Sequence, residues 1–103
     1  MKPSDALEET RAAIRAVVEA NRAKNARVFG SVLRGGDDED SDLDILVDPV
    51  EETTLFDLGA IQGELSESLG VKVDILTPMS LPEKFREKVI SEAKKIGTRF
   101  QVE

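Results

Sequence analysis

The 103-residue sequence predicts a single α/β domain that spans residues 1–103. Three stretches place apolar residues at helical spacing, and three shorter stretches have the apolar pattern of β-strands. A chain of this length buries about two thirds of its unfolded surface on folding, so we expect it to fold alone. Hydrophobic residues make up 40% of the chain and aromatic residues 4%, so the predicted core is aliphatic.

The first predicted helix covers about residues 4–20. Apolar residues such as Ile14 and Val18 recur at helical spacing on one face, and charged residues occupy the other. Ser4 or Asp5 is the expected N-cap. We interpret the segment as an amphipathic helix that packs on a sheet.

A short first strand is expected over residues 26–29, and it leads directly into Gly30 and Ser31. Gly30 lets the backbone pass close to a ligand, and Ser31 offers a hydroxyl donor. The residues that follow can open a short helix, whose free N–H groups would attract an anion. Arg34 is a candidate for contact with a phosphate or a partner.

A second strand is predicted from strict alternation over residues 41–47. Asp42 and Asp44 therefore lie on one face, roughly 7 Å apart along the strand. Two carboxylates on one face need a counter-charge, and hard oxygen ligands suit magnesium. Phosphate donors beside such carboxylates suggest a nucleoside triphosphate bound as its metal complex. The residues that alternate are Leu43, Ile45 and Val47 on one face against Asp42, Asp44 and Leu46 on the other.

The segments between these strands and the next are an acidic loop and a second helix. The run Asp37–Asp40 is most simply a solvated loop, and a role in tuning metal or partner binding is the alternative. Thr53 or Thr54 is expected to cap the helix, and Gly70 to end it. Gly59 and Gly63 suggest a close helix–strand contact. The predicted buried stripe consists of Leu55, Leu58, Ile61, Leu65 and Leu69.

Residues 71–76 form the third predicted strand, in which Asp74 interrupts an apolar pattern. If this strand neighbours the second one, Asp74 lies about 5 Å from the row of Asp42 and Asp44. A last amphipathic helix is expected from a capping box at Ser80–Glu83 to Ile96, with Gly97 as its end and a short tail after it. The predicted apolar positions of this helix are Leu81, Phe85, Val89, Ala93 and Ile96.

Composition excludes several kinds of chemistry. The sequence has no cysteine and no histidine, which removes disulfides, Ser-His-Asp and Cys-His catalysis and the common zinc sites. The net charge of −7 argues against direct nucleic-acid binding. The sequence shows no signal-like N-terminus and no apolar run of about 20 residues, so a soluble, cytoplasmic protein without a membrane partner is expected.

Three other ligand-binding motifs fit the sequence less well. The stretch Gly30–Gly36 is similar to a phosphate loop but lacks the Lys and Ser/Thr that should follow its second glycine. The stretch Asp38–Asp42 is similar to a calcium loop, but Leu43 stands at its glycine position and Pro49 at its final glutamate. A Gly-x-Gly-x-x-Gly dinucleotide motif is absent.

One pattern in the sequence resembles the signature of the polymerase-β-type nucleotidyltransferase superfamily. In this pattern Gly30-Ser31 is followed by ten residues and then by Asp42-Leu43-Asp44. The longer strings Val28-Phe29-Gly30-Ser31-x-x-Arg34-Gly35 and Ser41-Asp42-Leu43-Asp44-Ile45-Leu46-Val47 are similar to its minimal nucleotidyltransferase branch. The resemblance extends to Val73-Asp74-Ile75-Leu76 and to the helix with Val89-Ile90-Ser91-Glu92-Ala93, and so covers nearly the whole chain. Leu33, where the family often has alanine, and the four acids before Ser41 depart from the pattern.

The resemblance implies a polymerase-β-like fold, with a small mixed β-sheet flanked by helices. It implies that Asp42, Asp44 and Asp74 form a catalytic triad that binds Mg2+ and that Gly30 and Ser31 hold the triphosphate of ATP. Two metal ions about 3.5–4 Å apart can activate the attacking oxygen and neutralise the leaving pyrophosphate. Minimal members commonly accompany a HEPN-domain toxin as its antitoxin, in a hetero-oligomer. Some transfer AMP to a tyrosine of that toxin and silence its ribonuclease activity.

Two other functions stay open from the sequence. One is a non-catalytic antitoxin that blocks the toxin sterically. The other is the catalytic subunit of a transferase that modifies a small molecule such as an antibiotic. The intact set of candidate residues argues against the first, and the lack of an added acceptor-binding domain argues against the second.

Overall fold

The protein is a small mixed α/β domain with a four-stranded sheet, which confirms the predicted fold class. The structure is a computed structural model, and the description covers residues 2–96. The elements in chain order are α1 (Pro3–Ala20), β1 (Ala23–Phe29), α2 (Ser31–Arg34), β2 (Leu43–Pro49), α3 (Leu55–Leu69), β3 (Val73–Leu76), the 3-10 helix η1 (Pro78–Ser80), α4 (Glu83–Glu92) and β4 (Lys94–Lys95).

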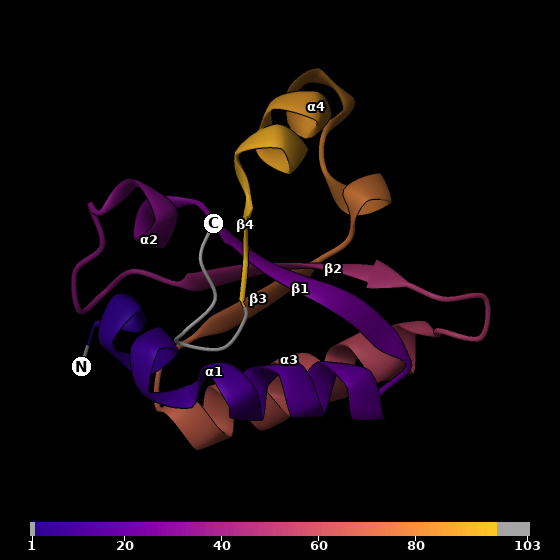
Figure 1. Cartoon of the computed structure of the whole chain (residues 1–103), viewed down its shortest axis with the longest axis horizontal. Helices are drawn as coiled ribbons and strands as arrows, with labels where there is room; N and C mark the ends of the chain where they lie inside the picture. Colours follow the sequence, from indigo (N-terminus) through magenta and orange to yellow (C-terminus); the bar gives the residue numbers. More distant parts are fainter. Residues whose placement is uncertain (1, 97–103) are drawn as a thin grey trace.

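The sheet has the strand order β3-β2-β1-β4. Strand β1 pairs antiparallel with both β2 and β4, whereas β2 and β3 run parallel. Figure 1 shows α1 and α3 packed together on one side of the sheet, while α2, η1 and α4 lie on the other side. The parallel pair therefore sits at one end of the sheet, and α3 supplies the connection between its two strands.

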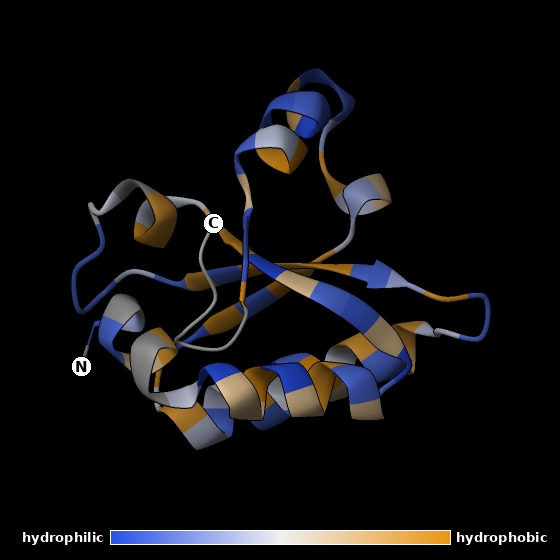
Figure 2. Cartoon of the chain, in the orientation of Figure 1, coloured by the Kyte–Doolittle hydropathy of each residue, from blue (hydrophilic) through white to orange (hydrophobic). Residues whose placement is uncertain are grey.

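The hydrophobic core lies between the sheet and the pair α1 and α3. Burial of alternate residues along β2 confirms the predicted alternation, because Leu43, Ile45 and Val47 all belong to this core. Leu46 points to the opposite face and is buried too, on the side where Leu81 is also buried. Figure 2 shows the hydrophobic residues concentrated on the strands and on the faces of the helices beside them. The α1 and α3 side chains in this core are Ile14, Val18, Ile61 and Leu65.

The first helix begins earlier than predicted. Its first residue is Pro3 and its N-cap is Lys2, which makes no side-chain capping bond, so the expected caps at Ser4 or Asp5 are wrong. Proline fits a first helical turn because its missing N–H would have no partner there. The first turn thus needs no capping side chain.

Strand β1 also begins earlier than predicted, at Ala23 rather than residue 26. A register irregularity between Lys24 and Arg27 accounts for the difference, and Asn25 within it has φ 55°. Asparagine tolerates this left-handed conformation, so residues that look like a turn form a bulge inside the strand. The buried Arg27 side chain pairs with Asp48 of β2, which also accepts a bond from Asn25 at 2.8 Å.

The predictions for α3 hold at its ends and fail along one face. Thr54 caps the helix in a reciprocal bond with Asp57, and Gly70 ends it with φ 72°. Leu55, however, is 85% exposed and does not belong to the buried stripe. No atom lies within 4 Å of a Cβ built on Gly59 or Gly63, so the predicted close helix–strand contact at these glycines is wrong.

The last helix is shorter than predicted. Helix α4 ends at Glu92, and Ala93 is already extended so that β4 can pair with β1. The predicted capping box at Ser80 is also wrong, because Ser80 bonds to Thr77 instead. Strand pairing therefore overrides the helical spacing of the C-terminal residues. The predicted helix end at Gly97 and the tail after it lie outside the described residues.

The acidic run between α2 and β2 forms an exposed turn. Asp38 accepts bonds from the backbone of Asp40 and from the hydroxyl of Ser41, which fixes the loop locally. This geometry agrees with the simpler interpretation, a solvated loop. Within residues 2–96, no helix is both long enough and apolar enough to cross a membrane.

Candidate active site

Gly30 forms a tight turn between β1 and α2. Its backbone angles are φ 78° and ψ −148°, a conformation that is essentially restricted to glycine. A Cβ built on Gly30 would lie 2.3 Å from Oδ2 of Asp44. The preceding residue, Phe29, is paired with Asp44 across the two strands. The strand pairing therefore brings the Asp44 carboxylate against the Gly30 backbone, and a side chain at residue 30 would push it away.

The short helix α2 follows this turn, as the sequence predicted. Ser31 is its first residue and Arg34 its last, and Gly35 ends it in the left-handed conformation with φ 74°. Helix α2 packs against β1 and β2, so its position is tied to the strands that carry the acids. For Arg34 the structure places the backbone and does not describe the side chain, so its predicted phosphate contact stays a prediction.

The three predicted acids lie on neighbouring strands. Asp44 on β2 and Asp74 on β3 are directly paired in the parallel register, which confirms that the two strands are adjacent. Paired residues on adjacent strands lie about 5 Å apart. Asp42, just before β2, lies near the Asp74 carboxyl and forms an ion pair with Nζ of Lys72 at 3.6 Å. The fold thus places all three acids at one end of the parallel strand pair.

The surroundings of Asp74 raise the pKa of its carboxyl group. Partial burial is the largest cause, and the nearby Asp42, through a hydrogen bond and its charge, raises the pKa further, while the charge of Lys72 lowers it. The Lys72 ammonium group therefore offsets part of the negative charge of this pair of acids.

These side chains fit magnesium in their chemistry and backbone positions. Carboxylate oxygens are the ligands that Mg2+ prefers, and the pairing of Asp44 with Asp74 places two of them side by side. Within residues 2–96, however, no group of three or more histidine, cysteine, aspartate or glutamate side chains is gathered closely enough to hold a metal ion. Asp42 lies near Asp74, while the Asp44 carboxylate lies against the Gly30 backbone. The side chains of Asp42, Asp44 and Asp74 would have to change rotamer to converge on one ion.

A cavity of about 260 Å³ opens beside this cluster, between the Gly30 turn and α4. The helical spacing of α4 predicted a packing role for Val89 and indicated no role for Glu92. The pairing of β4 with β1 helps to hold this last turn of α4 near the site, and no local sequence signal indicates that pairing. The residues that line the cavity are Phe29, Gly30, Leu33, Asp44, Val89 and Glu92.

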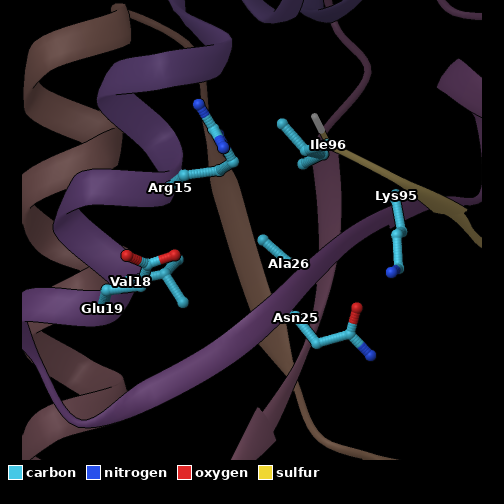
Figure 3. A pocket seen from close by; sticks show the side chains of 7 residues that line it. All are labelled: Arg15, Val18, Glu19, Asn25, Ala26, Lys95 and Ile96. Carbon is cyan, nitrogen blue, oxygen red and sulfur yellow. The ribbon is translucent and has the colours of Figure 1, made fainter. Parts of the chain in front are cut away.

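A smaller cavity of about 140 Å³ lies elsewhere, between α1, β1 and β4. Figure 3 shows side chains of Arg15 and Glu19 from α1 facing Ala26 on β1 and Ile96 after β4. None of the predicted site residues lines this cavity. The candidate active site is therefore the acidic cluster with the cavity between the Gly30 turn and α4.

The sequence model of the nucleotidyltransferase domain matches residues 10–96, which contain every candidate site residue. The chain belongs to the nucleotidyltransferase family. This membership confirms the resemblance seen in the sequence, and it agrees with the location of the acids and the Gly30 turn on adjoining strands. The family match concerns the domain as a whole and does not assign roles to single residues.

Curated relatives support the same family. A protein of Methanocaldococcus jannaschii, provisionally named a protein adenylyltransferase, is 41% identical over 70 residues, which cover 68% of this nucleotidyltransferase and 75% of that protein. The protein adenylyltransferase MntA of Thermococcus cleftensis is 40% identical over 65 residues, which cover 63% of this chain and 66% of MntA.

Solved structures share the fold. A structure provisionally described as a minimal nucleotidyltransferase has a TM-score of 0.78 and 41% identity, covering 87% of this chain and 92% of that chain. A chain in the complex of a tri-AMPylated Shewanella oneidensis HEPN toxin with its MNT antitoxin has a TM-score of 0.65 and 17% identity, covering 89% and 72%. At 17% identity this second likeness concerns the fold alone.

Replacing Asp74 with asparagine is expected to stabilise the metal-free nucleotidyltransferase at neutral pH. Because the folded state raises the pKa of Asp74, the folded state holds this proton more tightly than the unfolded state, and its stabilising effect is lost as the pH rises through the folded pKa. Asparagine keeps a donor for Asp42 without a charge. We expect a higher melting temperature than the unmodified protein at pH 7 in EDTA, and a difference that shrinks toward pH about 4. An equal difference at both pH values would contradict the assignment.

Replacing Lys72 with methionine is expected to increase the affinity for a divalent cation. The Lys72 ammonium group occupies the surroundings of Asp42, at 3.6 Å from its Oδ2, and competes there with any other cation. An exposed ion pair contributes about 0.2–1 kcal/mol, so Mn2+ titration should show an affinity higher by up to about fivefold. Lys24→Met serves as the control. It makes the same charge change near the start of β1, whereas the Gly30 turn and the acids lie at the other end of that strand. A weaker affinity in Lys72→Met would show that Lys72 assists binding rather than competing.

Proposed function

We propose that this chain is a magnesium-dependent protein adenylyltransferase. It transfers AMP from ATP to a tyrosine of a cognate HEPN ribonuclease toxin and thereby acts as its antitoxin, in a hetero-oligomer with that toxin. The observation that supports this most is the register that pairs Asp44 with Asp74 beside the Gly30 turn. The relatives named protein adenylyltransferases and the fold shared with an MNT antitoxin support the choice of acceptor. ATP is a cytoplasmic substrate, and we place the reaction in the cytoplasm.

The residues divide into two groups by their chemistry. Asp42 and Asp44 would hold Mg2+ at the start of β2, and Asp74 would complete the ligand set from β3. The metal would neutralise phosphate charge there and lower the pKa of the attacking hydroxyl. Gly30 and Ser31 hold the triphosphate, and Arg34 is the candidate for a further phosphate contact. Asp74 also accepts the proton of the tyrosine hydroxyl.

The reaction is a displacement at the α-phosphorus of ATP. The tyrosine oxygen forms a bond to this phosphorus, the bond to the β-phosphate oxygen breaks, and pyrophosphate leaves with its electron pair. The sequence contains no histidine, so a carboxylate is the available side-chain base near the strand ends.

The experiment that tests this proposal is an intact-mass measurement of the toxin after co-expression. We expect the HEPN protein to gain one or more AMP units with the unmodified chain and none with Asp42→Asn. Asp40→Asn is the matched control, because it makes the same chemical change in the exposed turn two residues earlier. This control is expected to modify the toxin normally.

Two results would replace the proposal with its alternatives. A HEPN protein that binds the chain and never gains mass would indicate a steric antitoxin. A HEPN protein that does not bind at all would remove the antitoxin role, and small-molecule acceptors would then be the candidates.

A further inference from the structure

The cavity between α4 and the Gly30 turn is not needed for binding of the metal or the triphosphate. We propose that it binds the nucleoside part of the nucleotide, with Val89 in contact with the base and Glu92 accepting a hydrogen bond from a nucleoside donor group. The donor is a ribose hydroxyl or an amino group of the base. This inference rests on the proposed function, because it takes the triphosphate to lie at Gly30 and Ser31.

The composition of the cavity favours a neutral, flat ligand over phosphate. Phe29 and Leu33 on one side and Val89 on the other give it apolar walls, and all three are only partly exposed. Its ionisable lining residues are Asp44 and Glu92, which repel phosphate oxygens. Among the described lining residues none is lysine or arginine. A nucleoside matches this lining because it is uncharged, has an aromatic face and carries hydrogen-bond donors.

The position of the cavity also fits a nucleoside attached to a triphosphate. Gly30 belongs both to the cavity lining and to the turn where we place the phosphates, and Asp44 belongs both to the lining and to the acidic cluster. A volume of about 260 Å³ is close to the lower end of the range, about 300–1,000 Å³, in which small-molecule sites are found. The phosphate chain can therefore leave the cavity directly at the metal-binding acids.

Helix α4 is fixed independently of any ligand. Arg86 donates hydrogen bonds to the carbonyl oxygens of Pro78 at 2.9 Å and Leu81 at 3.1 Å, which ties α4 to η1. On the other side, Lys94 pairs with Val28 only two residues after α4 ends. The two attachments place Val89 and Glu92 opposite the Gly30 turn before a nucleotide binds.

Titration calorimetry of the full chain with two probes tests the inference. The probes are ATP with Mg2+, and inorganic tripolyphosphate with Mg2+, which has the phosphates and no nucleoside. Val89→Trp fills the cavity, and Glu92→Gln removes the charge of the acceptor. We expect Val89→Trp to weaken ATP binding about tenfold or more and Glu92→Gln to weaken it about three- to tenfold, the loss expected when a neutral hydrogen-bond acceptor replaces a charged one. Both variants should bind tripolyphosphate as the unmodified chain does.

Ile90→Trp is the matched control, because Ile90 is the next residue of α4 and lies outside this cavity, on its exposed side. It should bind both probes normally. If Val89→Trp fails to fold, Glu92→Gln still decides the result, because Glu92 is exposed and no core residue depends on it. Equal weakening of both probes, or of neither, in the Glu92 and Val89 variants would overturn the inference and leave the proposed function intact. An unmodified chain that binds neither probe would overturn the proposed function itself.

Discussion

Replacing Gly30 with alanine is expected to abolish AMP transfer. The new Cβ would lie 2.3 Å from Oδ2 of Asp44, closer than any real contact, so the carboxylate or the strand that carries it must move. A displacement of about 1 Å in an active site costs on the order of a hundredfold in rate. The backbone at Gly30, with φ 78°, adds strain of about 1–3 kcal/mol for any other residue. We therefore expect a lower melting temperature together with a loss of activity of at least about a hundredfold.

Gly35→Ala separates these two effects. Gly35 also has a positive φ, 74°, but no atom lies within 4 Å of the position that its new Cβ would take, so this variant adds backbone strain without a clash. It should lower the melting temperature and keep the transfer activity. The measurement is transfer of AMP to the toxin by intact mass, beside a thermal melt of each variant. Similar activity in the two variants would show that contact between residue 30 and Asp44 does not position the carboxylate.

Replacing Asp44 with asparagine is expected to remove transfer while leaving the fold intact. The change keeps the shape of the side chain and removes the charge that would bind the metal from the centre of the cluster. Loss of one preorganised electrostatic group costs about a hundred- to a thousandfold in rate. The metal-free variant should melt no lower than the unmodified protein, because one of three clustered negative charges has gone.

Ligand-induced stabilisation gives a readout of Asp44 that does not need the toxin. A ligand that binds only the folded state adds about 2.7 kcal/mol when its concentration is about 100 times its dissociation constant. MgATP should raise the melting temperature of the unmodified chain and of Asp40→Asn, and should have little effect on Asp44→Asn. Retained transfer in both Asp42→Asn and Asp44→Asn would rule out the metal-based mechanism.

The parts of the fold that depend on short-range patterns could be predicted from the sequence. Alternation along residues 43–47 indicated correctly which side of β2 enters the core, since a strand repeats every two residues. The Thr54 cap and the Gly70 end of α3 were also predicted, because caps depend on a few neighbouring residues. The sequence placed Asp74 near Asp42 and Asp44 only on the condition that the third strand lies beside the second. The observed register, in which Asp44 pairs with Asp74, confirms that the two strands are neighbours.

The errors arose where contacts between distant segments decide the structure. The predicted helix to Ile96 has suitable spacing, but the pairing of Lys94 and Lys95 with β1 ends the helix at Glu92. Nothing in the sequence indicated that Glu92 lines a cavity with Gly30, because this contact joins residues far apart in the chain. Leu55 fits the helical stripe of α3 and is nevertheless exposed. Periodicity describes a face, and only the tertiary structure determines what covers that face.

The edge of the sheet that carries Asp74 is closed to another strand. The outward backbone N–H of Val73 donates to the Ser66 hydroxyl at 3.1 Å, and that of Ile75 donates to Oε1 of Gln62 at 3.0 Å. A polypeptide that added to this edge would have to displace both side chains of α3 before it could form ladder hydrogen bonds. We therefore expect the proposed protein acceptor to contact this edge through side chains and not to add to the sheet as a fifth strand.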